Sequence, residues 1–180
     1  MTDKKPWDYR NEGEFERAGE HYTYRAYDSL SDPLSVENGL DAMRWAALCY
    51  RLAGIMHRAE NRSRQGVLIA QDIQAHVLDD PREKTLVQEC IADFHAIGRL
   101  EGMTEAHEEA IKMYENTGIA TESGLISNGI CDNAIMFTKY LTDRSANFKV
   151  EELEGPLFPH TTRVAFKMEH MDSLIESFET

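Results

Sequence analysis

The sequence repeats a short pattern three times, in Phe15-Glu16-Arg17-Ala18-Gly19, Tyr50-Arg51-Leu52-Ala53-Gly54 and Phe94-His95-Ala96-Ile97-Gly98. Each copy has an aromatic residue, two variable positions, a small or apolar residue and a glycine. Each lies in a stretch whose apolar residues recur with a helical period. Because a glycine inside a helix costs about 1 kcal/mol relative to alanine, three glycines in matching frames suggest a shared purpose. We expect Gly19, Gly54 and Gly98 to mark close helix crossings in a stack of helical hairpins.

The same periodicity runs through most of the chain and predicts an all-α fold of about seven helices. The expected helices span approximately residues 12–29, 40–60, 63–78, 82–100, 104–116, 122–142 and 162–178. Pro33 breaks the chain after the first helix, and Asp80-Pro81 ends the third and begins the fourth. No stretch of the sequence has a pattern long enough to predict a β-strand. The fold class is therefore either stacked helical hairpins, as in an α-solenoid, or a compact bundle.

The chain divides into four parts. Residues 1–11 form an N-terminal arm, residues 12–142 a helical-repeat domain, residues 143–160 a linker and residues 161–180 a C-terminal capping helix. In the last helix, apolar residues alternate at steps of four and three and form one seam: Val164, Met168, Met171, Ile175 and Phe178. This seam either covers the open end of the stack or joins two copies of the chain.

The composition limits the classes of partner. The net charge of −13 disfavours non-specific binding to nucleic acid or to an anionic membrane. No apolar run is long enough to cross a membrane, and the N-terminal residues lack the apolar core of a signal peptide, so we expect a cytoplasmic protein. The 32 acidic residues, with 12 arginines against 7 lysines, resemble the composition of proteins from salt-loving archaea.

Motifs for catalysis and metal binding are missing from the sequence. The three cysteines, Cys49, Cys90 and Cys131, form no C-x-x-C pair and are expected to be free thiols. The seven histidines form neither H-E-x-x-H nor Glu-x-x-His. No nucleophile elbow or phosphate-binding loop is present. We therefore expect no catalytic residue, no metal and no cofactor.

Arginines follow one helical face around the second copy of the pattern. Arg44, Arg51 and Arg58 are seven residues apart and Arg62 follows four later, so one continuous helix places all four close together. Two interpretations stay open. The arginines are either a hydrated strip paired with acidic neighbours, or a partner-binding site for an acidic segment, a phosphopeptide or a C-terminal carboxylate.

The repeated pattern resembles the first helix of a tetratricopeptide repeat, which carries an aromatic, an apolar, a small and a second aromatic residue. The matching residues are Phe15, Ala18, Gly19 and Tyr22, then Tyr50, Ala53 and Gly54, then Phe94, Ile97 and Gly98, with Ala110 and Tyr114 matching a second helix. His57 and Glu101 depart from the pattern, and the glycines are 35 and 44 residues apart, which is irregular for this family. The long helices look more like the branch of soluble NSF attachment proteins. The resemblance covers residues 12–142 and implies protein–protein interaction without catalysis or cofactor.

These observations predict a non-enzymatic adaptor that binds a protein or peptide, with an acidic segment held by the arginines. A first alternative is a small all-α enzyme or ligand-binding sensor with a pocket between helices, near Tyr50, His57 and His95. A second alternative is a homo-oligomeric structural component assembled through residues 161–180.

Overall fold

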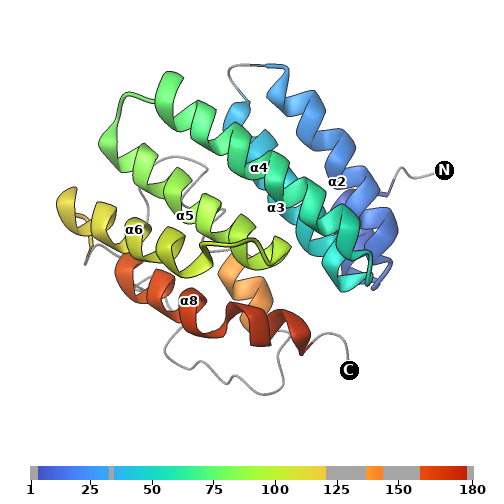
Figure 1. Ribbon diagram of the computed structural model, residues 1–180. Coiled ribbons are helices and arrows are strands. Elements are labelled where there is room, and N and C mark those ends of the chain that lie inside the picture. Colours follow the sequence, from blue (N-terminus) through green and yellow to red (C-terminus); the bar gives the residue numbers. More distant parts are fainter. Residues whose placement is uncertain (1–3, 33–34, 121–136, 144–158, 178–180) are drawn as a thin grey trace.

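The computed structural model describes residues 4–32, 35–120, 137–143 and 159–177, and over these ranges the fold is all-α, as predicted. The labelled helices are α1 (Pro6–Asn11), α2 (Phe15–Leu30), α3 (Val36–Leu52), α4 (Met56–His76), α5 (Pro81–Gly98), α6 (Met103–Asn116) and α8 (His160–Glu176). Residues 137–143 are also helical. Figure 1 shows the helices following one another across the molecule, from α2 through α4 and α5 to α6 and α8.

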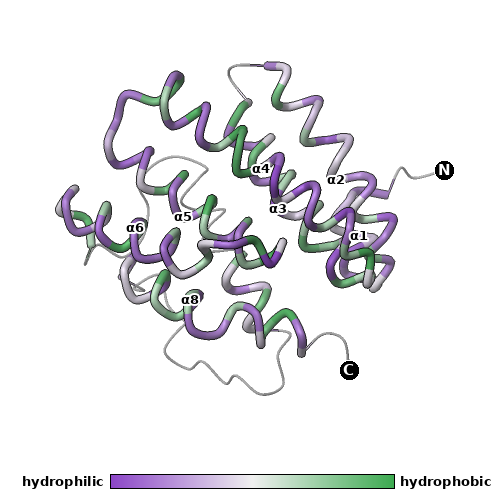
Figure 2. Tube along the Cα trace, viewed as in Figure 1, coloured by the Kyte–Doolittle hydropathy of each residue, from purple (hydrophilic) through white to green (hydrophobic). Residues whose placement is uncertain are grey.

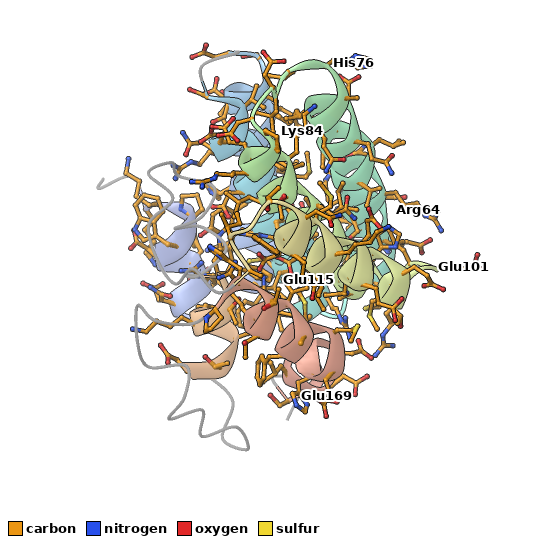
Figure 3. All side chains as sticks on the ribbon, turned by 90° about the vertical axis from the view of Figure 1, so that its left-hand side faces the viewer. Arg64, His76, Lys84, Glu101, Glu115 and Glu169 are labelled. Carbon is orange, nitrogen blue, oxygen red and sulfur yellow. The ribbon has the colours of Figure 1, made fainter. Side chains whose placement is uncertain are left out.

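Each helix from α1 to α6 packs against the next one along the chain, and α8 returns to pack against α6 and α5. The core lies around α3 and α5, which also contact each other and are buried on almost every face. A helix that is apolar around most of its circumference needs neighbours on all sides, which explains their central position. Figure 2 shows the corresponding apolar stretches in these helices. Charged side chains such as Arg64, Glu101 and Glu169 point away from the body (Figure 3).

The prediction of one helix over residues 40–60 is wrong, because the chain turns at Gly54. Gly54 has φ +72°, a left-handed conformation that glycine adopts without strain. Its N–H donates to the carbonyl of Arg51, and the N–H of Ile55 donates to the carbonyl of Tyr50, both at 2.9 Å. This pair of hydrogen bonds is a Schellman motif, which ends α3. A Cβ on Gly54 would meet no atom within 4 Å, so this glycine forms a turn and not the expected close crossing.

The other two glycines of the pattern do mark close crossings, as predicted. A Cβ on Gly98 of α5 would lie 2.5 Å from the Cβ of Ser63 on α4, and one on Gly19 of α2 would lie 3.0 Å from the ring of Tyr50 on α3. The tightest crossing involves a glycine outside the pattern. A Cβ on Gly66 of α4 would lie only 2.2 Å from the ring of Phe94 on α5.

Both ends of the described chain pack against its other helices, and the N-terminal arm does so more closely than expected. Residues 6–11 of the predicted arm form α1, and Tyr9 stacks on His21 of α2 with ring centroids 4.8 Å apart. In α8 the seam residues Val164, Met171 and Ile175 are buried within this same chain, as a capping helix requires. Phe178 and nearly all of the predicted linker, residues 144–158, lie outside the described residues. Most of the helix expected at 122–142 also lies outside them.

We expect the substitution Gly66→Ala to destabilise the protein by about 1–3 kcal/mol, although alanine favours a helix. The added methyl group would overlap the ring of Phe94, which is fully buried, so the surrounding packing would have to shift. Urea unfolding followed by circular dichroism measures this change. Gln71→Ala, at an exposed position of the same helix, is the control and should shift the free energy of unfolding by no more than about 0.5 kcal/mol.

A smaller residue at position 94 should relieve the overlap. The double variant Gly66→Ala/Phe94→Leu should therefore be more stable than the sum of its two single changes, because the contacting pair is coupled. Strict additivity of the two changes would contradict the proposed crossing.

Candidate functional site

The four predicted arginines do not form one strip, so the prediction of a single partner-binding face is wrong. Arg44 and Arg51 lie on α3 and are 2% and 0% exposed. Arg58 and Arg62 lie on α4, where their side chains reach the surface. The turn at Gly54 separates the two pairs, because it gives α3 and α4 different axes and so interrupts the common face.

Arg44 is an internal ion-pairing residue. Its Nη1 donates to Oδ2 of Asp93 on α5 at 2.7 Å, and its Nη2 donates to Oδ1 of Asp41, one turn earlier on α3, at 2.8 Å. The guanidinium also lies over the ring of Phe137, 4.3 Å from its centroid. These contacts join α3 to α5 and to residues 137–143, so Arg44 faces away from any external partner.

Arg51 joins α3 to two other helices. Its Nη1 donates to the carbonyl of Ala96 near the end of α5 at 2.8 Å, and its Nη2 donates to the carboxylate of Asp172 on α8. A cation beside the last carbonyls of a helix is favoured by the helix dipole. Arg51 therefore stabilises the packing of α3, α5 and α8.

Arg44 belongs to a buried ionic cluster that the sequence analysis missed. We define this cluster as Asp41, Arg44, Glu89, Asp93, Arg163 and Lys167. Arg163 donates from Nε and Nη2 to the two oxygens of Glu89, at 2.8 and 2.6 Å. Lys167 bridges Glu89 at 2.7 Å and Asp93 at 3.1 Å, and the hydroxyl of Tyr114 on α6 donates to Glu89 at 2.6 Å. Three carboxylates thus face three cations, so the cluster carries no net charge.

The spacing of these residues is the signal that could have found them. Glu89 and Asp93 are four residues apart on α5, and Arg163 and Lys167 are four residues apart on α8. Each pair therefore lies on one face of its helix, beside buried apolar residues such as Ala92 on α5 and Val164 on α8. Two faces with opposite charges at the same spacing favour direct pairing between helices.

The environment of Glu89 keeps it ionised. Burial by itself would raise the pKa of Glu89, but the charges and hydrogen bonds of Arg163 and Lys167 hold the pKa well below its usual range. Close by, burial lowers the pKa of His107, whose Nδ1 lies 2.8 Å from the carbonyl of Met103. A compensated cluster of this kind fixes helices relative to one another and keeps Glu89 deprotonated.

We expect Glu89→Gln to lower the free energy of unfolding at neutral pH by about 3–5 kcal/mol, because it leaves buried cations without their partner. A carboxyl group whose pKa is lowered by folding stabilises the protein above its unfolded pKa, about 4.3. That stability is lost as the pH falls through the folded pKa. The difference between wild type and Glu89→Gln should therefore shrink as the pH falls below about 4.3.

Urea unfolding over a series of pH values tests this dependence. Glu108→Gln, at an exposed position of α6, is the matched control and should follow the wild-type curve. Parallel curves for wild type and Glu89→Gln at all pH values would contradict the assignment of Glu89 as an ionised, paired group.

The exposed pair of arginines lines a groove between α2 and α4. This α2–α4 groove has a volume of 730 Å³ and is lined by Glu20, Thr23, Tyr24, Tyr27, Tyr50, Arg58, Asn61, Arg62 and Gln65. Tyr50 comes from α3, between the two outer helices, and Gly19 leaves room for its ring. Tyr24 is 77% exposed and Tyr27 is 47% exposed, so two large aromatic side chains stand in the groove with much of their surface uncovered.

Arg62 is held in place without a carboxylate partner among the described residues. Arg62 forms no ion pair with these residues. Its Nη1 donates to the hydroxyl of Tyr27 at 2.9 Å and to the side-chain oxygen of Gln65. Its Nε is buried and has no hydrogen-bond acceptor in the described part of the chain. The guanidinium of Arg58 lies over the ring of Tyr50, 5.4 Å from its centroid, and its ion pairs to Glu16 and Glu20, at 3.7 and 3.5 Å, are long and exposed, so they contribute little. Both arginines can therefore take up a carboxylate from outside.

The residues of the predicted enzyme pocket are not gathered in this groove. Tyr50 lines it, but His57 is exposed on α4, and the Nδ1 of His95 lies 2.8 Å from the carbonyl of Glu101. Burial raises the pKa of Cys49 and Cys90 to about 12, so neither thiol is reactive at neutral pH, and Cys131 lies outside the described residues. In residues 4–32, 35–120, 137–143 and 159–177, no three histidine, cysteine or acidic side chains gather as metal ligands do.

No family model, curated protein or solved structure matches this chain. The resemblance to tetratricopeptide repeats therefore stays a prediction from the sequence. Among the described residues, none of the helices combines the length and the apolar character that a membrane-spanning helix needs.

Proposed function

We propose that this protein is a non-enzymatic adaptor of tetratricopeptide-like type, which binds an acidic peptide segment in the α2–α4 groove. The observation that carries the proposal is Arg62, a cation without a carboxylate partner among the described residues, set beside two exposed tyrosines. Arginine forks pair with carboxylates in two parallel hydrogen bonds, which suits an acidic partner.

The exposed tyrosines support a peptide as the occupant. Tyrosine and arginine are enriched among the residues that carry most of the binding energy in protein interfaces. Tyr27 is oriented by its hydrogen bonds to Arg62 and Gln65, so little side-chain entropy remains to be lost on binding. Tyr24 makes no such hydrogen bond to any described residue and offers a large flat surface at the edge of the groove.

The length of the groove limits the segment that it holds. The lining residues of α2 run from Glu20 to Tyr27, which at about 1.5 Å per helical residue spans about 10 Å. An extended chain covers that distance with about three residues. We therefore expect a short recognition core that contains at least one aspartate or glutamate, with apolar or aromatic neighbours.

Selection from a random peptide library displayed on phage tests the proposal with no partner assumed. Wild type should enrich acidic peptides, and their binding should weaken as salt is raised, because charge pairs at a surface are screened. The double variant Arg58→Glu/Arg62→Glu should weaken the selected peptides roughly tenfold to hundredfold, since a hydrogen bond to a charged group is worth about 1.5–3 kcal/mol. Tyr24→Ala should also weaken them without altering the fold, because Tyr24 is mostly exposed.

The matched control is Arg17→Glu/Arg64→Glu. It makes the same change of charge at two exposed positions outside the groove, Arg17 on α2 and Arg64 on α4. It should retain peptide binding, and Figure 3 shows Arg64 pointing away from the body. If the library yields no acidic peptides, or if both double variants bind the selected peptides equally, the groove is not the binding site.

A further inference from the structure

A second concave feature lies where α1 and residues 137–143 meet α2 and α3. This N-terminal cleft has a volume of about 370 Å³, and its walls include Trp7, Arg10, Arg25, Trp45, Lys139 and Tyr140. It shares no lining residue with the α2–α4 groove. Its volume is in the range of small-molecule sites, which begins at about 300 Å³.

Arg10 is the central cation of the cleft. Its guanidinium lies over two aromatic rings, 4.0 Å from the centroid of Trp45 and 4.4 Å from that of Tyr140. The stacking fixes the plane of the guanidinium. The N–H groups point outward in that plane, so the rings do not cover them. The Nε is buried and finds no hydrogen-bond acceptor among the described residues. An arginine held in this way is pre-organised to receive a planar or tetrahedral oxyanion.

The local charge is positive, although the chain as a whole is strongly acidic. Arg25 lies over Trp7, 5.5 Å from its ring centroid, and within the described residues neither Arg25 nor Lys139 forms an ion pair. Of the two carboxylates in the lining, Asp41 is engaged by Arg44 of the buried ionic cluster at 2.8 Å. Three cations therefore face one carboxylate, that of Asp143, which forms no ion pair with any described residue. In a chain of net charge −13 this local excess of cations favours an anion as ligand.

The aromatic lining indicates what the rest of the ligand is. Trp7 is 40% exposed at the cleft and offers a flat face, while Trp45 and Tyr140 line the wall behind Arg10. Flat unsaturated rings bind such faces by stacking. We propose that the N-terminal cleft binds a small organic anion in which a carboxylate or phosphate group is attached to a flat unsaturated ring. The oxyanion faces Arg10, Arg25 and Lys139, and the ring lies against Trp7.

The two tryptophans of the chain are Trp7 and Trp45, and both line the cleft. Their two indole N–H signals in a ¹H–¹⁵N NMR spectrum therefore report on this site directly. We would titrate the full chain with five probes: benzoate, phenyl phosphate, inorganic phosphate, benzyl alcohol and benzamidine. Benzoate and phenyl phosphate should shift the indole signals saturably, and inorganic phosphate should bind at least about tenfold more weakly because it lacks the ring. The neutral alcohol and the cationic benzamidine should give no saturable shift.

Substitutions of the three cations test whether they cause the shifts of the indole signals. Arg10→Gln should abolish the shifts, and Arg25→Gln/Lys139→Gln should weaken benzoate binding by about tenfold or more. Arg25 and Lys139 are exposed, so this second variant keeps its fold even if the loss of Arg10 does not allow folding. Arg17→Gln/Arg64→Gln, which removes two arginines elsewhere, is the matched control and should bind as wild type does.

Three results would overturn the proposal: no saturable shift with either aromatic anion, equal binding of benzyl alcohol, or unchanged binding by Arg25→Gln/Lys139→Gln. The relative affinities of benzoate and phenyl phosphate show whether the natural ligand carries a carboxylate or a phosphate. Because Arg58→Glu/Arg62→Glu leaves the cleft intact, it should bind the probes normally, so a failure of the groove and a failure of the cleft are distinguishable.

Discussion

The carboxylates of Glu89 and Asp93 lie fully buried at the centre of the fold, and three other helices supply the groups that neutralise or bind them. Burying an unpaired carboxylate is very unfavourable, so the arrangement is allowed only when Arg44 from α3, Tyr114 from α6 and the cations of α8 all reach α5 together. An apolar core tolerates small shifts between helices. A buried ionic cluster does not, because the loss of one partner leaves a charge that neither water nor protein compensates. The positions of α3, α6 and α8 around α5 therefore depend on this cluster.

The positions of the α2–α4 groove and the N-terminal cleft also depend on the central helix α3. Arg44 and Arg51 of α3 donate to acceptors inside the protein. Because their charges are compensated in this way, α3 can lie at the centre of the fold. Beyond the turn at Gly54, α4 carries Arg58 and Arg62 outward beside the tyrosines of α2. Arg10 reaches its position by stacking on Trp45 of the buried helix α3. Each surface site thus has an arginine without a carboxylate partner among the described residues, Arg62 in the groove and Arg10 in the cleft.

Much of the secondary structure could be predicted because it depends on local signals. Asp80-Pro81 begins α5 as expected, with the Asp80 side chain accepting from the N–H of Arg82 at 2.9 Å. Gly54 misled the prediction because the same residue serves two purposes: glycine allows close helix crossing, and it also ends a helix in the left-handed conformation. Gly66 was missed because its importance comes from Phe94, which is 28 positions away and on another helix. The ionic cluster was missed for the same reason, since Glu89 and Lys167 are 78 residues apart.

By itself, the sequence determined that the chain forms amphipathic and largely apolar helices and that its net charge is strongly negative. The helices depend on the periodicity of neighbouring residues, which is local, and the net charge is a sum over all residues. Only the tertiary structure decided which arginines are internal and which face outward, because that depends on the direction in which α4 leaves the turn after α3. It also decided that Arg10, Trp45 and Lys139 share one cleft. Residues so distant in sequence are brought together by packing and by charge compensation in the core, and no local pattern encodes that.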